Sequence, residues 1–349
     1  MNFYDWHKTL SYNADVTFVI AARGRGKTYG LRLQCIKDYI KDGFTFVEVC
    51  RFKSELAPVM DGYFNRLSEE FPEYAFKTEK GKGYISKKPE DGGNYEWNVI
   101  CYFIALTDSQ NAKKRTYNKV KRIIFDEAIL ENYDRHHKYL QREYQKLANV
   151  VDTTTRERAD NQSIRPHLYL MGNSVDLLNP YFTFYGINKM PEFGYHWYRN
   201  KTALVHYEDP GSYADEKLEG TLSGRMTAGT AEGETAARNI FEQTDEGLIE
   251  SKPRNAKFEL GFHDEGRKYG VWADYKNGYY YINNKIPNNT HEPVYYITRS
   301  DASTNLLAAR RASKWMQSLS DAHYMNIIRY STPAIMNHFL DMLQKFGLR

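Results

Sequence analysis

A loop of small and basic residues carries the clearest chemical pattern in the chain. Residues 21–28 read Ala-Ala-Arg-Gly-Arg-Gly-Lys-Thr, between an apolar run at 16–20 that predicts a buried strand and a helical pattern. A strand, a loop ending in Gly-Lys-Thr and a helix form a phosphate-binding loop. Its lysine charge serves the β- and γ-phosphates, and its threonine hydroxyl serves Mg²⁺. We therefore expect contacts with ATP and Mg²⁺ from Ala22, Arg23, Gly24, Arg25, Gly26, Lys27 and Thr28.

A second motif supplies the acids that such a loop needs. The apolar run at 122–125 ends in Asp126 and Glu127. Asp126 would hold Mg²⁺ through water, and Glu127 would polarise the water that attacks the γ-phosphate. Alone, this motif also fits a strand that ends in solvent. Placed about a hundred residues after Lys27, it predicts ATP binding and hydrolysis.

A polar residue after a further strand is a candidate for reading the γ-phosphate. The run at 167–171 is strand-like and is followed by Gly172, Asn173 and Ser174. Asn173 is the first candidate to contact the γ-phosphate and position water, and Ser174 is the second. A simple turn built from these small polar residues is the alternative interpretation.

Two groups of basic residues could act across a subunit boundary. Arg156, or second to it Arg158, could stabilise the transition-state charge on the ATP of a neighbouring subunit. The alternative is an arginine in a surface salt bridge. Lys113 opens the densest basic cluster, which could reach DNA phosphates or a neighbour's nucleotide, or could simply be solvated.

The elements that must position these residues alternate between strands and helices. Apolar runs predict strands over 16–20, 44–49, 98–106, 122–125 and 167–171, and helical patterns cover 29–40 and 56–71. This alternation predicts an α/β fold with a mostly parallel central sheet. We expect residues 1–200 to form a P-loop ATPase domain of the ASCE type.

Composition changes after residue 200. Residues 209–250 are rich in Gly, Thr, Ala and Glu, so we expect a linker or small subdomain over 201–252. Residues 253–349 predict a second, α+β domain. Its strands are expected over 257–262, 269–274, 279–283 and 294–298, and its helices over 306–319 and 333–346.

Composition and charge exclude several classes of protein. The 349 residues are 41% hydrophobic and 26% charged, as in ordinary globular proteins, and no apolar run approaches the ~20 residues that span a bilayer. The N-terminus has no apolar signal core, so we expect neither secretion nor a membrane partner. Three scattered cysteines predict buried reduced thiols. Net charge is +5 over residues 1–200, −7 over 201–250 and +6 over 251–349, which does not establish nucleic-acid binding by itself.

Together these motifs resemble those of the genome-packaging ATPases of φ29-like short-tailed bacteriophages. The resemblance covers most of the chain. Family members usually carry Gly where Ala21 stands, a departure that the small alanine side chain should tolerate. The resemblance rests on residues 22–28, 51–56, 124–127, 152–156 and 173–174, and on the Asn-Pro-Tyr-Phe run at 179–182.

The resemblance implies an ATP-driven translocase that packages double-stranded DNA into a preformed capsid. It implies a homopentameric ring docked on the portal, or connector, protein. ATP would lie at the subunit interfaces, with Arg156 donated in trans and Lys113 as a second interface residue. A packaging RNA is a further expected partner. The expected location is the host cytoplasm, transiently at the portal vertex.

The resemblance also implies that the C-terminal domain is a degenerate, RNase H-like nuclease domain. Its acids are spread out without three clear strand-end carboxylates, so we expect it to bind DNA or the portal rather than to cut DNA. Two alternatives stay open: a terminase-like motor with an active metal-dependent nuclease, and a nucleotide-binding assembly component that does not hydrolyse ATP. The acids are Glu259, Asp264, Glu265, Asp274, Asp301 and Asp341.

Overall fold

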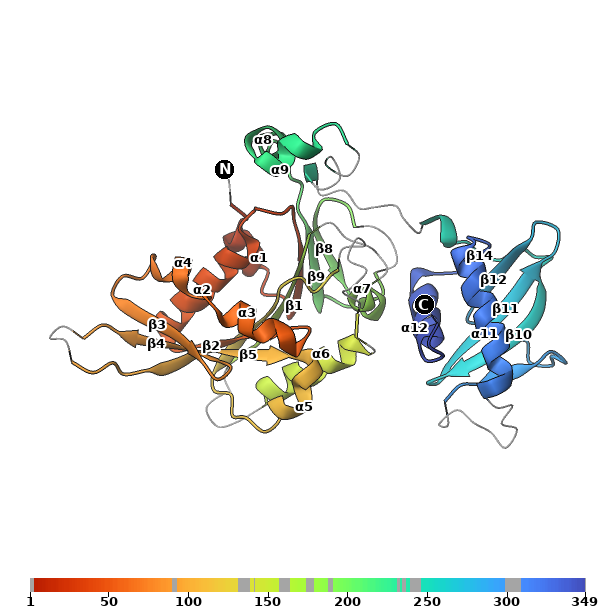
Figure 1. The fold of residues 1–349 in the computed structure, drawn as a ribbon, viewed down its shortest axis with the longest axis horizontal. Helices are drawn as coiled ribbons and strands as arrows, with labels where there is room; N and C mark the ends of the chain where they lie inside the picture. The colour runs from red at the N-terminus through yellow and green to blue at the C-terminus, as the bar shows by residue number, and fades with distance from the viewer. Residues whose placement is uncertain are drawn as a thin grey trace. The chain divides into compact units, whose positions relative to one another are not determined.

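The computed structural model divides the chain into two compact units (Figure 1). Unit 1 comprises residues 1–176 and 191–242, and unit 2 comprises residues 177–190 and 243–349. Within the described part of the chain, no helix is long and apolar enough to cross a membrane. The structure describes residues 3–89, 93–130, 139–140, 142–156, 164–173, 179–187, 191–230, 233, 237–238, 246–298 and 309–348.

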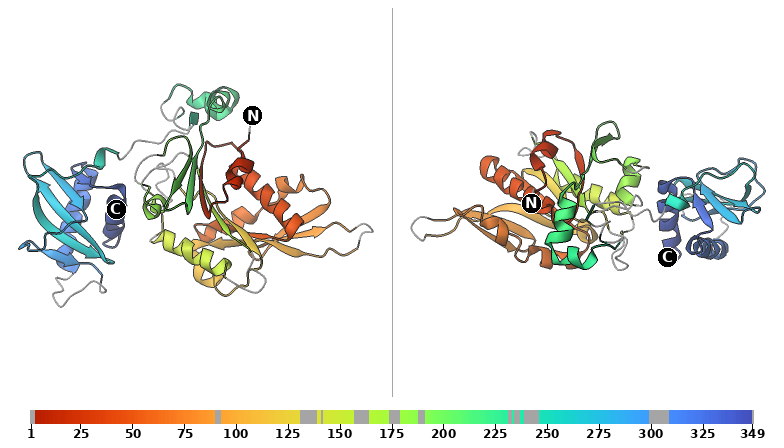
Figure 2. Two further views of the ribbon diagram at one scale, coloured as in Figure 1. Left: turned by 180° about the vertical axis from the view of Figure 1, so that it is seen from behind. Right: turned by 90° about the horizontal axis from the view of Figure 1, so that it is seen from above.

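Unit 1 is built on a nine-stranded sheet with the order β3-β4-β5-β2-β6-β7-β1-β9-β8. Figure 2 shows the ribbon from two further directions. From β5 to β9 each strand is parallel to its neighbours, whereas β3, β4 and β8 pair antiparallel at the two edges. The predicted mostly parallel sheet is thus confirmed. The strands are β1 (Val16–Ile20), β2 (Thr45–Cys50), β3 (Tyr74–Glu79), β4 (Lys82–Lys87), β5 (Asn98–Ala105), β6 (Val120–Phe125), β7 (His167–Gly172), β8 (Gly194–Tyr198) and β9 (Ala203–Tyr207).

The apolar strands predicted from sequence form the middle of this sheet. β1, β2 and β7 are buried along their whole length, as expected for parallel strands covered on both faces. Side chains from α1, α2 and the α3–α4 region share one core cluster with this sheet. The helices and 3₁₀ turns of unit 1 are α1 (Trp6–Ser11), α2 (Lys27–Asp42), η1 (Lys53–Glu55), α3 (Leu56–Met60), α4 (Asn65–Ser68), η2 (Leu106–Asp108), α5 (Ser109–Ala112), α6 (Glu143–Thr154), α8 (Tyr213–Gly220) and α9 (Leu222–Thr227).

Two expectations for unit 1 need correction. The single helix expected over 56–71 is broken into α3 and α4, because Gly62 adopts a φ of +65° that no helix continues. The boundary expected at residue 200 falls inside the β8–β9 hairpin. The apolar β9 is buried beside β1, with Ala203 opposite Val16, so the sheet extends into the segment expected as a linker.

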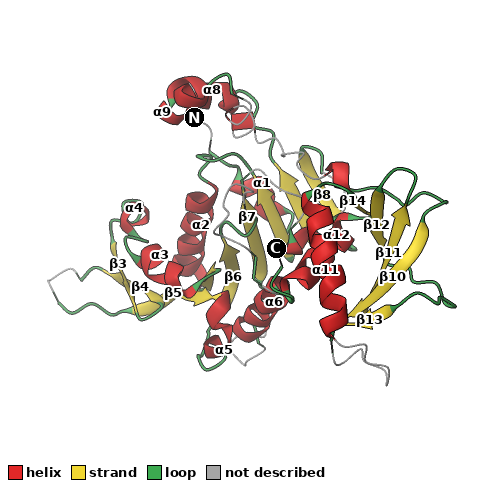
Figure 3. Cartoon of the chain, turned by 45° about the vertical axis from the view of Figure 1, so that its right-hand side comes forward, coloured by secondary structure: helices red, strands yellow, loops and turns green. Residues whose placement is uncertain are grey.

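Unit 2 has the predicted α+β composition. Its five-stranded sheet has the order β13-β10-β11-β12-β14, in which β10, β11 and β12 form an antiparallel meander. Helices α11 and α12 pack against this sheet (Figure 3), with Met316 and Phe339 in a shared core beside Phe262 and Val271. The elements are α7 (Pro180–Tyr185), η3 (Glu246–Leu248), β10 (Lys257–Asp264), β11 (Arg267–Asp274), β12 (Tyr279–Asn283), β13 (Val294–Tyr296), α11 (Ala309–Tyr324), β14 (Ile328–Tyr330) and α12 (Pro333–Gln344).

The Asn-Pro-Tyr-Phe run has a structural role at the start of α7. The Asn179 side chain caps the helix by accepting hydrogen bonds from the backbone N–H groups of Tyr181 (3.1 Å) and Phe182 (2.8 Å). Pro180 occupies the first helical turn, where its missing N–H costs nothing. The α7 helix joins unit 2 through a hydrogen bond of 2.7 Å from Asn337 Nδ2 on α12 to Thr183 Oγ1.

Candidate active site

The loop between β1 and α2 has the backbone of a phosphate-binding loop. Gly24 and Gly26 have φ values of +90° and +72°, in the left-handed region where glycine is favoured. Gly26 is the N-cap of the 16-residue α2, so the first N–H groups of the helix are open to a ligand. Because these N–H groups carry the positive end of the helix dipole, this end of α2 suits a phosphate.

A cavity of about 480 Å³ lies over this loop. It gathers residues from the carboxyl ends of three neighbouring strands, β6, β7 and β1, and from the start of α2. All five residues predicted for catalysis or metal binding at strand ends and in the loop line it together. The lining residues are Arg23, Gly24, Gly26, Lys27, Thr28, Tyr29, Asp126, Glu127, Gly172 and Asn173.

Thr28 and Asp126 form the pair of oxygens predicted to serve a metal ion. The Thr28 hydroxyl donates a hydrogen bond of 2.7 Å to Asp126 Oδ2 across 98 residues of sequence. A hydroxyl and a carboxylate are hard oxygen ligands of the kind that Mg²⁺ prefers, and Mg²⁺ usually keeps several waters besides. The residues present therefore fit a magnesium ion bound with a nucleotide.

Lys27 is buried at the floor of the cavity. Its Nζ donates to the carbonyl oxygens of Ala21 (2.6 Å) and Ala22 (3.2 Å) and to Asn173 Oδ1 (3.0 Å). Burial lowers the pKa of Lys27 to about 8. A bound phosphate would supply the negative charge that this buried ammonium lacks. Asn173, at the end of β7, is thereby placed beside the lysine.

Glu127 lies at the mouth of the cavity with an exposed side chain. Its backbone has a φ of +51°, an uncommon conformation for a residue with a β-carbon. The Glu127 N–H donates 3.0 Å to Asp126 Oδ1, and its carbonyl oxygen accepts a hydrogen bond from Arg51. The backbone of Glu127 is therefore held on both sides, while its side chain lies at the cavity.

The predicted interface residues do not line the cavity. Arg156 follows α6 with a side chain that is 56% exposed and 3.3 Å from Asp152. Lys113 is exposed directly after α5. The side chain of Arg25 is held elsewhere, by Glu208 at 2.6 Å. Ser174 and Arg158, the second candidates for their roles, lie outside the described residues.

Comparison with known proteins shows the family of the chain. The model of the family described as Podovirus DNA encapsidation protein (Gp16) matches residues 1–347. The chain belongs to this family. Its relatives include the DNA packaging protein of Bacillus phage phi29, 30% identical over 353 residues that cover 99% of this chain and 98% of that protein.

Solved structures give the same result. The structure of the bacteriophage Phi-29 viral genome packaging motor assembly is similar over 99% of this chain and 100% of that chain, with 27% identity and a TM-score of 0.69. The N-terminal domain of the DNA packaging ATPase from bacteriophage phi29 matches 60% of this chain and 98% of that chain, with 32% identity and a TM-score of 0.51.

Two residues that contact the loop could not be identified from the sequence. Tyr213, from α8, donates a hydrogen bond of 3.1 Å to the Arg23 carbonyl oxygen and lies under the Arg25 guanidinium, 4.8 Å from ring centroid to Cζ. Trp6 Nε1 donates 2.8 Å to the Lys27 carbonyl oxygen. Both side chains support the loop from segments that are distant in the sequence, and the local sequence pattern does not predict these contacts.

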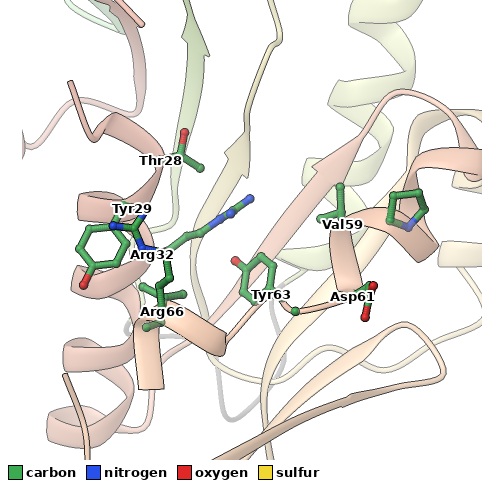
Figure 4. Close-up of a pocket in the computed structure, with 10 residues that line it drawn as sticks. Thr28, Tyr29, Arg32, Val59, Asp61, Tyr63 and Arg66 are labelled. Carbon is green, nitrogen blue, oxygen red and sulfur yellow. The ribbon is translucent and has the colours of Figure 1, made fainter. Parts of the chain in front are cut away.

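A second cavity of about 440 Å³ shares Thr28 and Tyr29 with the first. Figure 4 shows Arg32 and Tyr63 among the side chains that line it. Arg32 forms an ion pair with the buried Glu48, to which the Tyr63 hydroxyl also donates 2.8 Å. This network fixes the side chain of Arg32 on α2, one helical turn after the proposed metal ligand Thr28.

The acids of unit 2 are engaged in local pairs. Lys345 Nζ lies 2.6 Å from Asp264 and 2.8 Å from Glu265, and Glu259 accepts 2.6 Å from the Tyr275 hydroxyl. Within the described ranges no group of three His, Cys, Asp or Glu side chains is arranged to hold a metal ion. Asp301 lies outside those ranges. The three cysteines are free and buried, as predicted.

Proposed function

We propose that this chain is an ATPase that moves double-stranded DNA into a preformed capsid. The observation that carries the proposal is the convergence of Lys27, Thr28, Asp126, Glu127 and Asn173 on one cavity at a helix N-terminus. Phosphoryl transfer needs positioning and charge stabilisation rather than covalent chemistry, and these residue types supply both. Membership of the DNA encapsidation family supplies the substrate on which the energy would be spent.

Each residue has a separable role in the proposed mechanism. The N–H groups of the loop and of α2 would bind the phosphates, and Lys27 would place its charge on the β- and γ-phosphates. Thr28 and Asp126 would hold Mg²⁺, which when bound neutralises the charge that develops on the phosphate oxygens. Glu127 would orient water for in-line attack, and Asn173, already bonded to Lys27, would contact the γ-phosphate.

The exposed basic residues fit a site completed by a second copy of the chain. Arg156 forms an exposed ion pair with Asp152, which is weak enough to exchange for a phosphate. We propose that Arg156 acts in trans, with Lys113 as a second interface residue, in a homopentameric ring at the portal. The likeness to a solved packaging motor assembly supports a ring, and a packaging RNA and the host cytoplasm remain our expectations for partner and location.

Unit 2 is proposed to bind DNA or the portal without cutting DNA. Its acids Asp264 and Glu265 share an ion pair with Lys345, an arrangement that competes with metal binding. A motor must grip any sequence, so its DNA contacts should go to phosphates and weaken with salt. We propose that an ATPase domain, a linker and a C-terminal domain follow one another along the chain in that order, as expected from the sequence.

The deciding experiment is steady-state ATP hydrolysis with and without long double-stranded DNA. Glu127→Gln should lower turnover about 100-fold or more, because it removes the group that orients water. Glu96→Gln changes an exposed glutamate of the same unit that does not line the cavity, and it should be silent. Normal turnover in Glu127→Gln would favour the non-hydrolysing assembly component instead. DNA cleavage dependent on Mn²⁺ or Mg²⁺ would favour the active nuclease.

A further inference from the structure

Arg51, the first residue after β2, is a buried charged side chain that the mechanism above does not use. It is 3% exposed, and Glu143, at the start of α6, is 1% exposed. Arg51 Nε lies 3.1 Å and 3.0 Å from the two Glu143 carboxylate oxygens, and Nη2 lies 3.1 Å from Oε1. The pair is therefore a bidentate, fully buried ion pair between two elements of unit 1.

The Arg51 guanidinium also donates hydrogen bonds to the backbone of the segment that carries Glu127. Nη1 donates 3.2 Å to the Glu127 carbonyl oxygen, and Nη2 donates 2.8 Å to the Ala128 carbonyl oxygen. On the other side of this segment, the Ala128 N–H donates 2.9 Å to the Met171 carbonyl oxygen of β7. The backbone on the C-terminal side of Glu127 is thus bonded in two directions.

This clamp meets a specific need of Glu127. A non-glycine residue at positive φ lies about 1–2 kcal/mol above its preferred conformations, so surrounding contacts must hold it there. The conformation decides where the carboxylate points, because the side chain leaves from the same α-carbon. A buried ion pair is a poor device for stability alone, since its desolvation offsets much of its attraction. Its two carbonyl contacts give it a geometric role instead.

We propose that Arg51, oriented by Glu143, is the positioning residue that sets the direction of the Glu127 carboxylate. The inference rests on the proposed function, in which Glu127 orients the attacking water. Arg51 does not line the nucleotide cavity and contacts neither Lys27 nor Thr28 in the described contacts. Its loss should therefore lower kcat and leave nucleotide binding almost unchanged.

The first test compares kcat and KM of the full-length protein. Arg51→Met should lower kcat 10- to 100-fold, with the KM for ATP within about threefold of wild type. The matched control is Arg122→Met, which removes another buried arginine. Arg122 lies on β6, forms an ion pair with Asp38 of α2 and does not line the cavity. The control should lower the melting temperature with little change in kcat. The proposal would be overturned if kcat fell in both variants in proportion to their loss of stability.

The second test is a double-mutant cycle with Glu127→Gln. If Arg51 acts through Glu127, adding Arg51→Met to Glu127→Gln should change the residual rate less than twofold. Multiplicative losses would show that Arg51 acts by another route. Should Arg51→Met fail to fold, Arg51→Lys keeps the charge but lacks the fork that reaches both carbonyls, and the same cycle applies to it.

The outcomes separate the two proposals. Wild-type turnover in Glu127→Gln would refute the proposed function itself. Loss of turnover in Glu127→Gln with wild-type kcat in both Arg51 variants would leave that function standing and refute only the role of Arg51. Glu143→Gln provides an independent check, because it weakens the hold on Arg51 without touching its carbonyl contacts and should lower kcat less than Arg51→Met.

Discussion

Single residues in the site were predictable where chemistry follows from a position at a strand end. Lys27, Thr28, Asp126 and Asn173 were placed together because the carboxyl ends of parallel strands meet at one edge of a sheet. The partners that hold them were not predictable, since Tyr213 and Trp6 reach the loop only through the tertiary fold. Backbone conformation was equally hidden, because no pattern of residue types announces a positive φ at a glutamate.

Gly24 offers a test of how closely the loop is covered. A β-carbon there would meet the Tyr213 hydroxyl at 2.4 Å, and the φ of +90° strains any other residue. Gly24→Ala should therefore weaken ATP binding at least tenfold, measured by nucleotide fluorescence titration. Gly24→Ala combined with Tyr213→Phe should recover part of the affinity, because the clashing hydroxyl is gone while the strain remains.

The control for this prediction is Gly278→Ala. Gly278 also has positive φ, +75°, but a β-carbon there meets nothing within 4 Å and the residue lies in unit 2. It should cost stability without a change in ATP affinity. Equal affinity of Gly24→Ala and wild type would mean that the loop rearranges when nucleotide binds.

At the scale of elements, the central strands were predictable and the edges were not. Four central strands can be recognised in the sequence as apolar runs, because both of their faces are buried: β1, β2, β6 and β7. The β3–β4 hairpin is half exposed and mixes lysines with aromatic residues, so its periodicity is weak. The β9 strand is apolar, but it lies within residues 201–252, which are expected from the sequence to form a linker or small subdomain.

The N-terminal segment is joined to the β8–β9 hairpin by a half-buried cluster that should respond to pH. His206 Nδ1 lies 2.6 Å from the Tyr4 hydroxyl and its ring stacks on Tyr195 at 3.8 Å. Burial lowers the pKa of His206 from 6.5 to about 4. The unfolded chain takes up a proton below pH 6.5 while the folded chain does not, so this group makes stability fall as the pH drops from 6.5 towards 4.

His206→Gln isolates this contribution. The variant should be less stable than wild type at pH 7, because it loses the stacking on Tyr195. The difference should shrink by about 1–2 kcal/mol at pH 5, where only wild type has the histidine to protonate on unfolding. Urea unfolding at the two pH values measures it. A difference independent of pH would contradict a buried neutral His206.

At the scale of the whole molecule, the chain passes between its two units more than once. Residues 177–190 belong to unit 2, although unit 1 supplies the chain on both sides of them. The first domain expected from the sequence, residues 1–200, includes this segment. Membership is decided instead by tertiary contacts, namely the buried Tyr181 and Phe182 and the bond from Asn337 to Thr183.

This assignment predicts how a fragment behaves. A fragment of residues 243–349 lacks α7 and should be stabilised by adding a peptide of residues 177–190, because the peptide restores α7 and its hydrogen bond with α12. Melting curves with increasing peptide should show a rising transition temperature. A peptide with Phe182→Ser is the control and should give a smaller shift. No shift with either peptide would place α7 outside the core of unit 2.

The Arg51–Glu143 pair also has a consequence for timing within a ring. Glu143 begins α6, and Arg156 follows the end of the same helix. If Arg156 serves the neighbour's nucleotide, one guanidinium then touches both the glutamate of its own site and the helix that presents an arginine to the next site. In such a ring, the two ends of α6 would connect the geometry of one site to the arginine offered to the next site.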